Sequence, residues 1–331
     1  MFKSTGARKN YSFMEKFSIY IVLLVMFIIC SMLNENFLSG DNLTNIARQL
    51  AVGTILAYGE MLLIISGMLD LSAGSVLALA GVMSVTFYKS TGSLFGSVLV
   101  AIAVSVACNV VSGAMVANFR LPPFIATLAM QTIARGIALL LTKGQNVLQL
   151  GDYVVFGQGS FVGIPMPVIV LVFITAIIWY TLKHTRFGRS LYAIGGNEEA
   201  SIASGINVVL VKYKAFILNG VLVGIAGVLF MSRVNAGLPN GAVGYEMEGL
   251  TAAIVGGTSF SGGVGTTAGT LAGAFIIGFL NNIMNLTGVD SYIQQITKGA
   301  IIALAVIYDI QSKRKKTKRV VLVNENTAEK A

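Results

Sequence analysis

Charged residues are scarce in this chain. Only 11% of its 331 residues are Asp, Glu, Lys or Arg, whereas 55% are hydrophobic. A soluble globular domain carries about 25% charged residues, so this composition excludes an ordinary soluble fold. The apolar residues form continuous runs without strict alternation, which argues against a transmembrane β-barrel. The sequence therefore predicts an all-α polytopic membrane protein.

Residues that bind metals are also few. The chain has one histidine, His184, and two cysteines, Cys30 and Cys108, which both lie in apolar runs without CxxC spacing. Isolated thiols in such runs are typical buried hydrophobes. One histidine without nearby cysteines or paired carboxylates makes no metal site. We expect no metal in this chain.

Catalytic motifs are missing as well. No GxxxxGK[ST] phosphate loop occurs, and the glycine-rich stretch 256–265 has no lysine after its glycines. Without that lysine a triphosphate has no cradle. The motifs HExxH and GxSxG are also absent. We therefore expect that this chain is not an enzyme and that it binds no cofactor of its own.

Long apolar runs dominate what the sequence does contain. A helix needs about 20 apolar residues to cross the hydrocarbon core. We predict about ten transmembrane helices, with eight as the alternative. The third and eighth are short for full spans, so we expect them to be tilted, broken or half-embedded. The predicted helices are 17–33, 46–67, 74–88, 93–117, 122–142, 164–182, 209–232, 248–262, 264–286 and 292–310.

Positive charge divides unevenly between the two sides of this arrangement. Most of the 23 Lys and Arg residues fall on the side of the two chain ends. Because Lys and Arg collect on cytoplasmic loops, we place both termini in the cytoplasm and attribute the net charge of +9 to this bias, with no nucleic-acid binding. The predicted parts are a cytoplasmic segment 1–16, a transmembrane domain 17–310 and a basic cytoplasmic tail 311–331 that contacts anionic lipid.

The N-terminus has the outline of a signal peptide, since basic residues precede an apolar run. No small-x-small cleavage site follows the run, so we expect an uncleaved first helix. On the outer side, the longest connections are 143–163 and 233–248. We expect them to form an external surface that receives a partner, with simple connectors as the alternative.

One polar segment, 183–207, interrupts the apolar runs. A Gly-Gly pair before Asn197 predicts a turn. Asn197 is a good N-cap, two glutamates follow it where carboxylates favour the helix dipole, and Gly205 suits a helix stop. The segment therefore predicts a short helix over 198–204 on the cytoplasmic face that docks a partner. A connector without a partner is the alternative.

Glycines recur at helical spacing in two of the predicted helices. Gly220 and Gly224 form one GxxxG pattern, and Gly265, Gly269 and Gly273 form a longer one. Four-residue spacing places each set on one helix face, where a neighbouring backbone can approach closely. We expect this packing to occur within one subunit, with a dimer seam as the alternative.

Polar residues inside the predicted spans are functional candidates, because burial in lipid is unfavourable for them. Glu60 is the only carboxylate well inside a span. We prefer a structural role for it as a buried partner of Arg48 or Arg135, and the alternative is proton coupling. Neutral polar residues could line a path for a hydroxylated solute or form interhelical hydrogen bonds. The candidates are Gln131, Asn219, Asn281, Asn282 and Asn285.

Five stretches carry a more specific pattern. They are DLSAGSVLALAG (70–81), LPPFIATLAMQTIARG (121–136), FGRSLYAIGGNEEASIASGINV (187–208), LPNGAVGYEMEGLTAAIVGGTSFSGG (238–263) and GFLNNIMNLTGVDSYIQQITKGAIIALAVIYD (278–309). In this order they resemble the permease subunits of bacterial ABC sugar importers, and most of all the ribose-type permeases. They cover most of the chain beyond the first helix. One departure is Glu248, where the relatives usually have Asp.

The resemblance implies a multi-pass permease of the bacterial inner membrane that pairs with a second copy or a paralogue. It also implies a cytoplasmic ATP-binding protein that uses ATP-Mg and an extracytoplasmic sugar-binding protein. The family's coupling segment corresponds to residues 188–205. The implied coupling residues are Gly188, Gly195, Gly196, Asn197, Glu198, Glu199, Ala200, Ser204 and Gly205.

We therefore expect the transmembrane permease subunit of an ATP-driven, binding-protein-dependent importer of a ribose-like monosaccharide. An ion-coupled secondary carrier that depends on Glu60 is the second hypothesis. A membrane-embedded enzyme or scaffold is the third, and the missing catalytic motifs disfavour it.

Overall fold

Helices account for nearly all of the fold. The computed structural model describes the backbone of residues 5–328 and the side chains of residues 17–311. Seven helices in the described part are long and apolar enough to cross a membrane. They are α2 (Gly40–Ile65), α4 (Leu94–Ala117), α5 (Pro123–Thr142), α7 (Met166–His184), α10 (Val208–Val234), α12 (Thr267–Leu286) and the part Ser291–Gln311 of α13 (Ser291–Ala328).

Other elements complete the described chain. The remaining α-helices are α1 (Thr5–Leu33), α3 (Ala73–Thr91), α6 (Val155–Gln158), α8 (Arg186–Gly196), α9 (Glu198–Ala203) and α11 (Tyr245–Val255). Two 3₁₀ helices are η1 (Glu35–Leu38) and η2 (Gly151–Val154). Four two-residue strands are β1 (Val147–Leu148), β2 (Ser160–Phe161), β3 (Ile164–Pro165) and β4 (Ala236–Gly237).

The predicted helices correspond to helices of the structure, but their lengths differ. The apolar part of α1, α3 and α11 are not among the seven candidate spans. The prediction of one helix over 248–262 is wrong, because α11 ends at Val255 and Gly257, with φ +89°, turns the chain into a loop. The last helix continues to Ala328 through most of the predicted tail. The lipid contact expected of that tail falls on side chains outside the described residues 17–311.

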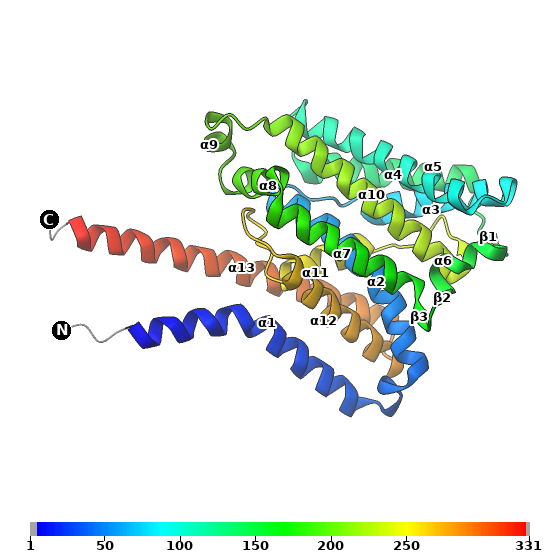
Figure 1. Cartoon of the computed structure of the whole chain (residues 1–331), viewed down its shortest axis with the longest axis horizontal. Helices are drawn as coiled ribbons and strands as arrows, with labels where there is room; N and C mark the ends of the chain where they lie inside the picture. The colour runs from blue at the N-terminus through cyan, green and yellow to red at the C-terminus, as the bar shows by residue number, and fades with distance from the viewer. Residues whose placement is uncertain (1–4, 329–331) are drawn as a thin grey trace.

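The bundle is elongated and its two ends differ (Figure 1). One end carries α8 and α9, and the first turns of α1 and the last turns of α13 point to the same side. The opposite end carries β1, β2 and β3. We call these the α8–α9 end and the strand end. At the strand end β1 pairs antiparallel with β4, so the two predicted outer connections are joined to each other.

Helix α10 packs closely against α4 and α3 because glycines open its surface. A Cβ added at Gly224 would lie 2.8 Å from the Cα of Ile102, and one at Gly220 would lie 2.8 Å from the Cα of Val106, both on α4. On another face, a Cβ at Gly227 would lie 3.0 Å from the carbonyl oxygen of Leu77 on α3. Small residues allow this close approach, and here it occurs within one chain.

The second glycine pattern behaves differently. Gly269 and Gly273 face the backbone of α11, next to Gly256 and Ala252. Gly265 lies in the loop before the N-cap Thr266 of α12. The expectation that all three glycines share one helix face is therefore wrong for Gly265, which instead packs against the side chain of Ile65.

The α4–α10 contact predicts the result of one substitution. Gly224→Ala should lower the thermal stability of the purified protein in detergent, since overpacking of a close contact costs about 1–3 kcal/mol. Gly53→Ala is the matched control, because Gly53 is also helical but has open space where a Cβ would stand. A Gly224→Ala protein as stable as the Gly53→Ala control would contradict the close approach of α4 and α10.

Candidate functional site

Three carboxylates gather inside the bundle although only Glu60 was expected there. Glu60 on α2 and Asp70 in the turn after α2 are each 1% exposed, and Glu246 on α11 is 6% exposed. The backbone N–H of Asp70 donates to Glu60 Oε2 at 3.3 Å. Glu246 is close enough to Glu60 and Asp70 to interact electrostatically. We call Glu60, Asp70 and their amide partners the buried carboxylate cluster.

The turn between α2 and α3 builds this cluster. After Ile65 the chain reverses at Gly67, whose φ is +78°. The side chain of Asp70 then accepts hydrogen bonds from both the N–H and the hydroxyl of Ser72, and the N–H of Leu71 donates to Thr127 Oγ1 at 3.1 Å. Helix α3 consequently begins beside Glu60. These side chains accept hydrogen bonds from backbone N–H groups of the turn, which lipid could not satisfy.

Two amide side chains close the cluster. Asn219 on α10 donates from Nδ2 to Asp70 Oδ2 at 2.7 Å and to Asn109 Oδ1 on α4 at 2.9 Å. Three buried oxygens nearby have no hydrogen-bond partner among the described residues: Glu60 Oε1, Asn219 Oδ1 and Glu246 Oε2. The cluster therefore links α2, α4 and α10 through polar contacts in a closed interior.

The ion pair expected for Glu60 does not form. Arg48 donates to the carbonyl oxygen of Gln158 at 2.8 Å. Arg135 donates to the carbonyl oxygens of Pro239 and Gly241 at 2.7 and 2.8 Å. Both guanidinium groups thus bind backbone carbonyls, and the preferred pairing of Glu60 with either arginine is wrong. Only the fold shows that Asp70 lies next to Glu60 in place of a cation.

Glu246 also borders an open cavity. The cavity of about 430 Å³ is lined by α3, α5 and α11, and Glu246, Gln131 and Arg135 supply polar groups. The amide of Gln131 donates to Glu246 Oε1 at 3.5 Å. Sequence reasoning missed Glu246 because it lies in a stretch rich in turn-forming residues, which was assigned to an outer connection.

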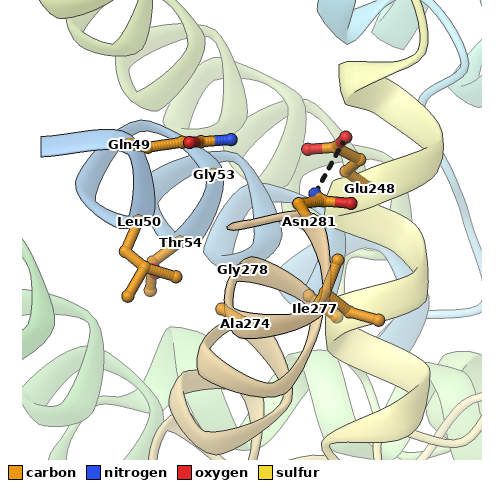
Figure 2. Close-up of a pocket in the computed structure, with 10 residues that line it drawn as sticks. Gln49, Leu50, Gly53, Thr54, Glu248, Ala274, Ile277, Gly278 and Asn281 are labelled. Atoms are coloured by element: carbon orange, nitrogen blue, oxygen red, sulfur yellow. Dashed lines mark hydrogen bonds between the residues drawn. The ribbon is translucent and has the colours of Figure 1, made fainter. Parts of the chain in front are cut away.

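Glu248 is the other acidic residue of the first turn of α11, and it faces a different side. Its Oε1 accepts from Asn281 Nδ2 of α12 at 3.2 Å, as Figure 2 shows, and forms an ion pair with Lys298 Nζ of α13 at 2.5 Å. A cavity of about 20 Å³ separates this group from α2, and Gln49 points into it (Figure 2). A larger cavity of about 380 Å³ opens between α11, α12 and α13.

The remaining amide candidates lie elsewhere. Asn282 and Asn42 exchange two hydrogen bonds, at 2.8 and 3.1 Å, and so join α12 to α2. Asn285 accepts from Gln294 at 2.9 Å, which joins α12 to α13. The path candidates thus occupy separate places, and those of α12 make interhelical contacts.

The polar segment 183–207 forms two helices, α8 and α9. Asn197 caps α9 by accepting from the N–H of Ala200 at 2.9 Å, and Gly205, with φ +80°, follows its end. Glu198 pairs with Lys212 of α10 at 2.8 Å. The side chain of Glu199 is exposed and has no hydrogen bond or ion pair with another described residue. The short helix is where the sequence predicts it.

Gly195 and Gly196 do not form the predicted turn. They are the last two residues of α8, and the chain turns at Asn197. Gly195 packs against the carbonyl oxygen of Ile65, and a Cβ there would lie 2.7 Å from the backbone nitrogen of Gly263. The N–H of Gly263 in turn donates to Ile65 O at 2.8 Å. The end of α8 therefore contacts the end of α2 and the loop 256–266.

The other members of the predicted coupling set lie elsewhere on α8 and α9. Gly188 packs on the backbone of α7, and its N–H donates to the α8 cap Thr185 at 3.0 Å. Ala200 and Ser204 are exposed on α9, and Ser204 is its C-cap. A cavity of about 630 Å³ lies beside α9 and reaches Arg120 and Met68. This end presents both a protruding helix and an adjacent hollow.

Comparison with known proteins identifies relatives of this arrangement. Residues 42–306 match the family model described as "Branched-chain amino acid transport system / permease component". The chain is 41% identical over 294 residues to the ribose import permease protein RbsC of Escherichia coli (strain K12), covering 87% of this chain and 92% of that protein. Identity to the ribose import permease protein RbsC of Bacillus subtilis (strain 168) is 38% over 299 residues, covering 89% and 93%.

A relative with a different printed substrate is the D-allose transport system permease protein AlsC of Escherichia coli (strain K12). It is 34% identical over 300 residues, which cover 90% of this chain and 92% of that protein. No solved structure matches the chain. The similarity extends over nearly the whole length of these permeases.

The carboxylate cluster predicts a strong effect of one amide. Asn219→Ala should destabilise the protein in detergent, because loss of a partner leaves buried groups unsatisfied at a cost of about 1–3 kcal/mol. Asn118→Ala is the matched control, since Asn118 also joins α4 to α10, by an exposed bond to Tyr213. The two variants would be compared by thermal unfolding. Equal melting temperatures would argue against a buried hydrogen bond between Asn219 and Asp70.

Proposed function

Because the chain belongs to the branched-chain amino acid transport system / permease component family, we propose that it is the transmembrane permease subunit of an ATP-driven importer of a ribose-like monosaccharide. The relatives named for ribose and allose import match nearly its whole length. The chain supplies a membrane path, and a separate ATP-binding subunit hydrolyses ATP-Mg. An extracytoplasmic binding protein delivers the sugar at the strand end.

The observation that carries the proposal is the capped helix α9 on the surface of the α8–α9 end. Glu199 extends from it without a partner in the described chain, and a large hollow lies beside it. A short exposed helix with small side chains such as Ala200 and Ser204 fits a groove on another protein. The ATP-binding subunit is the partner that binds α9 at this end of the bundle.

Backbone contacts offer a route from α9 into the bundle. Helix α8 leads directly into α9, and its end touches Ile65 of α2 and Gly263 of the loop 256–266. The hydroxyl of Tyr192 on α8 also donates to Gly265 O at 2.8 Å. Movement of α9 by the ATP-binding subunit would shift α2, α11 and α12 together. The size of this shift depends on how differently the partner binds the two states.

The proposed topology has ten helices, both termini in the cytoplasm and the α8–α9 end facing inward. The seven candidate spans are completed by α1, α3 and the half-length α11. An inner-membrane location, lipid contact and a dimer with a second copy or a paralogue belong to the same proposal. The bias of Lys and Arg toward the side of the chain ends supports this orientation.

A secondary carrier is the alternative, and one observation favours it. Glu60 is buried beside another carboxylate, and Glu60 Oε1 has no hydrogen-bond partner among the residues that the structure describes. Buried carboxylates of this kind serve as proton relays in membrane carriers. A carrier would move solute without an ATP-binding subunit and would depend on Glu60.

Charge reversal on α9 tests the proposed function. In vesicles containing the permease, its ATP-binding subunit and its binding protein, Glu199→Arg should reduce sugar uptake by at least about tenfold, because a mismatched charge at a protein interface costs several kcal/mol and each 1.4 kcal/mol is about a factor of ten. Glu35→Arg is the matched control, since Glu35 is an exposed glutamate on η1, in the short connection between α1 and α2. Uptake of labelled sugar and ATP hydrolysis would be measured together.

The opposite result is equally specific. Uptake that proceeds without ATP, is unchanged by Glu199→Arg and is abolished by Glu60→Gln would establish the secondary carrier. Normal thermal stability of each variant would be required before either result is interpreted.

A further inference from the structure

A half-length helix brings two polar cavities together inside the bundle. Helix α11 has 11 residues, which at about 1.5 Å per residue is roughly half of the hydrocarbon thickness of about 30 Å. Its end leads into the loop 256–266, which contacts α8 at the α8–α9 end. Its first turn therefore lies well inside the bundle. The N-cap there is Gly244, with φ +83° and no side chain to cap the helix.

The two cavities flank this first turn. On the α5 side, the cavity of about 430 Å³ contains Glu246, Gln131 and Arg135. On the α13 side, the cavity of about 380 Å³ contains Glu248, Lys298 and Gln295, with Thr251 on the same helix. Val243 borders both. Ligand sites have volumes of about 300–1,000 Å³, so each cavity has room for one monosaccharide.

Exposure separates these cavities from the buried carboxylate cluster. The side chains of Glu248 and Lys298 remain 17% and 31% exposed, although they form an ion pair. Glu60 is 1% exposed and enclosed by α2, α11 and the turn after α2. Ionisable groups that face a cavity within a membrane protein mark substrate paths. The α13-side cavity meets this condition, whereas the cluster does not.

The charges of the lining indicate the kind of solute. Each cavity holds a carboxylate and a cation: Glu248 forms an ion pair with Lys298, and Arg135 lines the same cavity as Glu246. Mixed charges and amides provide both donors and acceptors, which suits the hydroxyl groups of a neutral sugar. An aliphatic amino-acid side chain would leave these polar groups without partners, which is unfavourable. An anionic solute would be repelled by the carboxylates of Glu246 and Glu248.

We propose that the first turn of α11, with Glu248, Lys298 and Gln295, forms a subsite that contacts a neutral monosaccharide as it crosses the permease. Sugar hydroxyls donate to Glu248 and accept from Lys298 and Gln295. This inference rests on the proposed function, because it assigns residues to the path of the same sugar. The opposite cavity with Gln131 continues the polar surface around the same turn.

The first test uses the complete transporter in vesicles with D-ribose, D-allose and L-arabinose as probes. Glu248→Gln and Lys298→Gln should each reduce uptake of the transported sugar about tenfold, the effect of losing a hydrogen bond to a charged group. ATP hydrolysis stimulated by the loaded binding protein should stay near the wild-type rate. Glu35→Gln is the matched control and should retain uptake, because Glu35 is exposed on η1 and lines neither cavity.

The second test needs no ATP-binding subunit. In a Cys30→Ala, Cys108→Ala background, the thiol of a Gln295→Cys variant should react with N-ethylmaleimide more slowly when the transported sugar is present at high concentration. Ribose 5-phosphate and leucine should not slow it. The thiol of a Gln145→Cys variant is the matched control and should react equally with and without sugar, because Gln145 is exposed in the connection between α5 and β1 and lines neither cavity.

The outcomes separate this proposal from the proposed function. If wild-type vesicles show no uptake dependent on ATP and the binding protein, the proposed function fails. If uptake is normal but the Glu248 and Lys298 substitutions leave it unchanged, the subsite is overturned. A thiol at position 295 that no sugar protects, or that is unreactive even without sugar because another chain covers it, also overturns the subsite.

Discussion

Backbone that leaves a helix inside a membrane protein must find its hydrogen-bond partners within the protein, and this constraint organises the bundle. Two interruptions, 66–72 and 256–266, meet near the α8–α9 end, where the N–H of Gly263 donates to Ile65 O at 2.8 Å. Asp309 of α13 accepts from the N–H of Phe260 at 3.0 Å in the second loop. Because the contact between Gly263 and Ile65 joins backbone to backbone, a side chain at Gly195 would separate them. The same junction therefore satisfies the interrupted helices and connects them to the surface helix α9.

The acidic residues of the interior fall into two environments with different consequences. Glu60 and Asp70 are closed in by Asn219 and by the turn that they stabilise, so their contribution is to the shape of the bundle. Glu246 and Glu248 border cavities that also contain a cation, Arg135 for Glu246 and Lys298 for Glu248. Glu246 and Glu248 line different cavities, because a spacing of two residues on helix α11 directs their side chains to different sides. A transporter needs both environments, one to hold the helices and one to meet the solute.

Local features were predictable where the responsible contacts are local. The N-cap Asn197, the short helix after it and the stop at Gly205 depend on residues a few positions apart. The apolar runs were also readable, since each helix must cover about the same membrane thickness. Errors arose where long-range contacts decide. Gly195 and Gly196 stay helical because α8 packs against α2 and the loop 256–266, and α11 ends at Val255 because Gly256 meets the backbone of α12.

The sequence by itself determined that this is a helical membrane protein of the permease family with a polar helix outside the apolar runs. Hydrophobic length, charge distribution and capping residues are properties of short segments and need no knowledge of the fold. Only the tertiary structure decided that Glu60 lies beside Asp70 instead of an arginine, and that Glu248 meets Lys298 across 50 residues of chain. Such pairings join segments that are distant in sequence. No local pattern selects them, because they depend on burial and on how the helices approach one another.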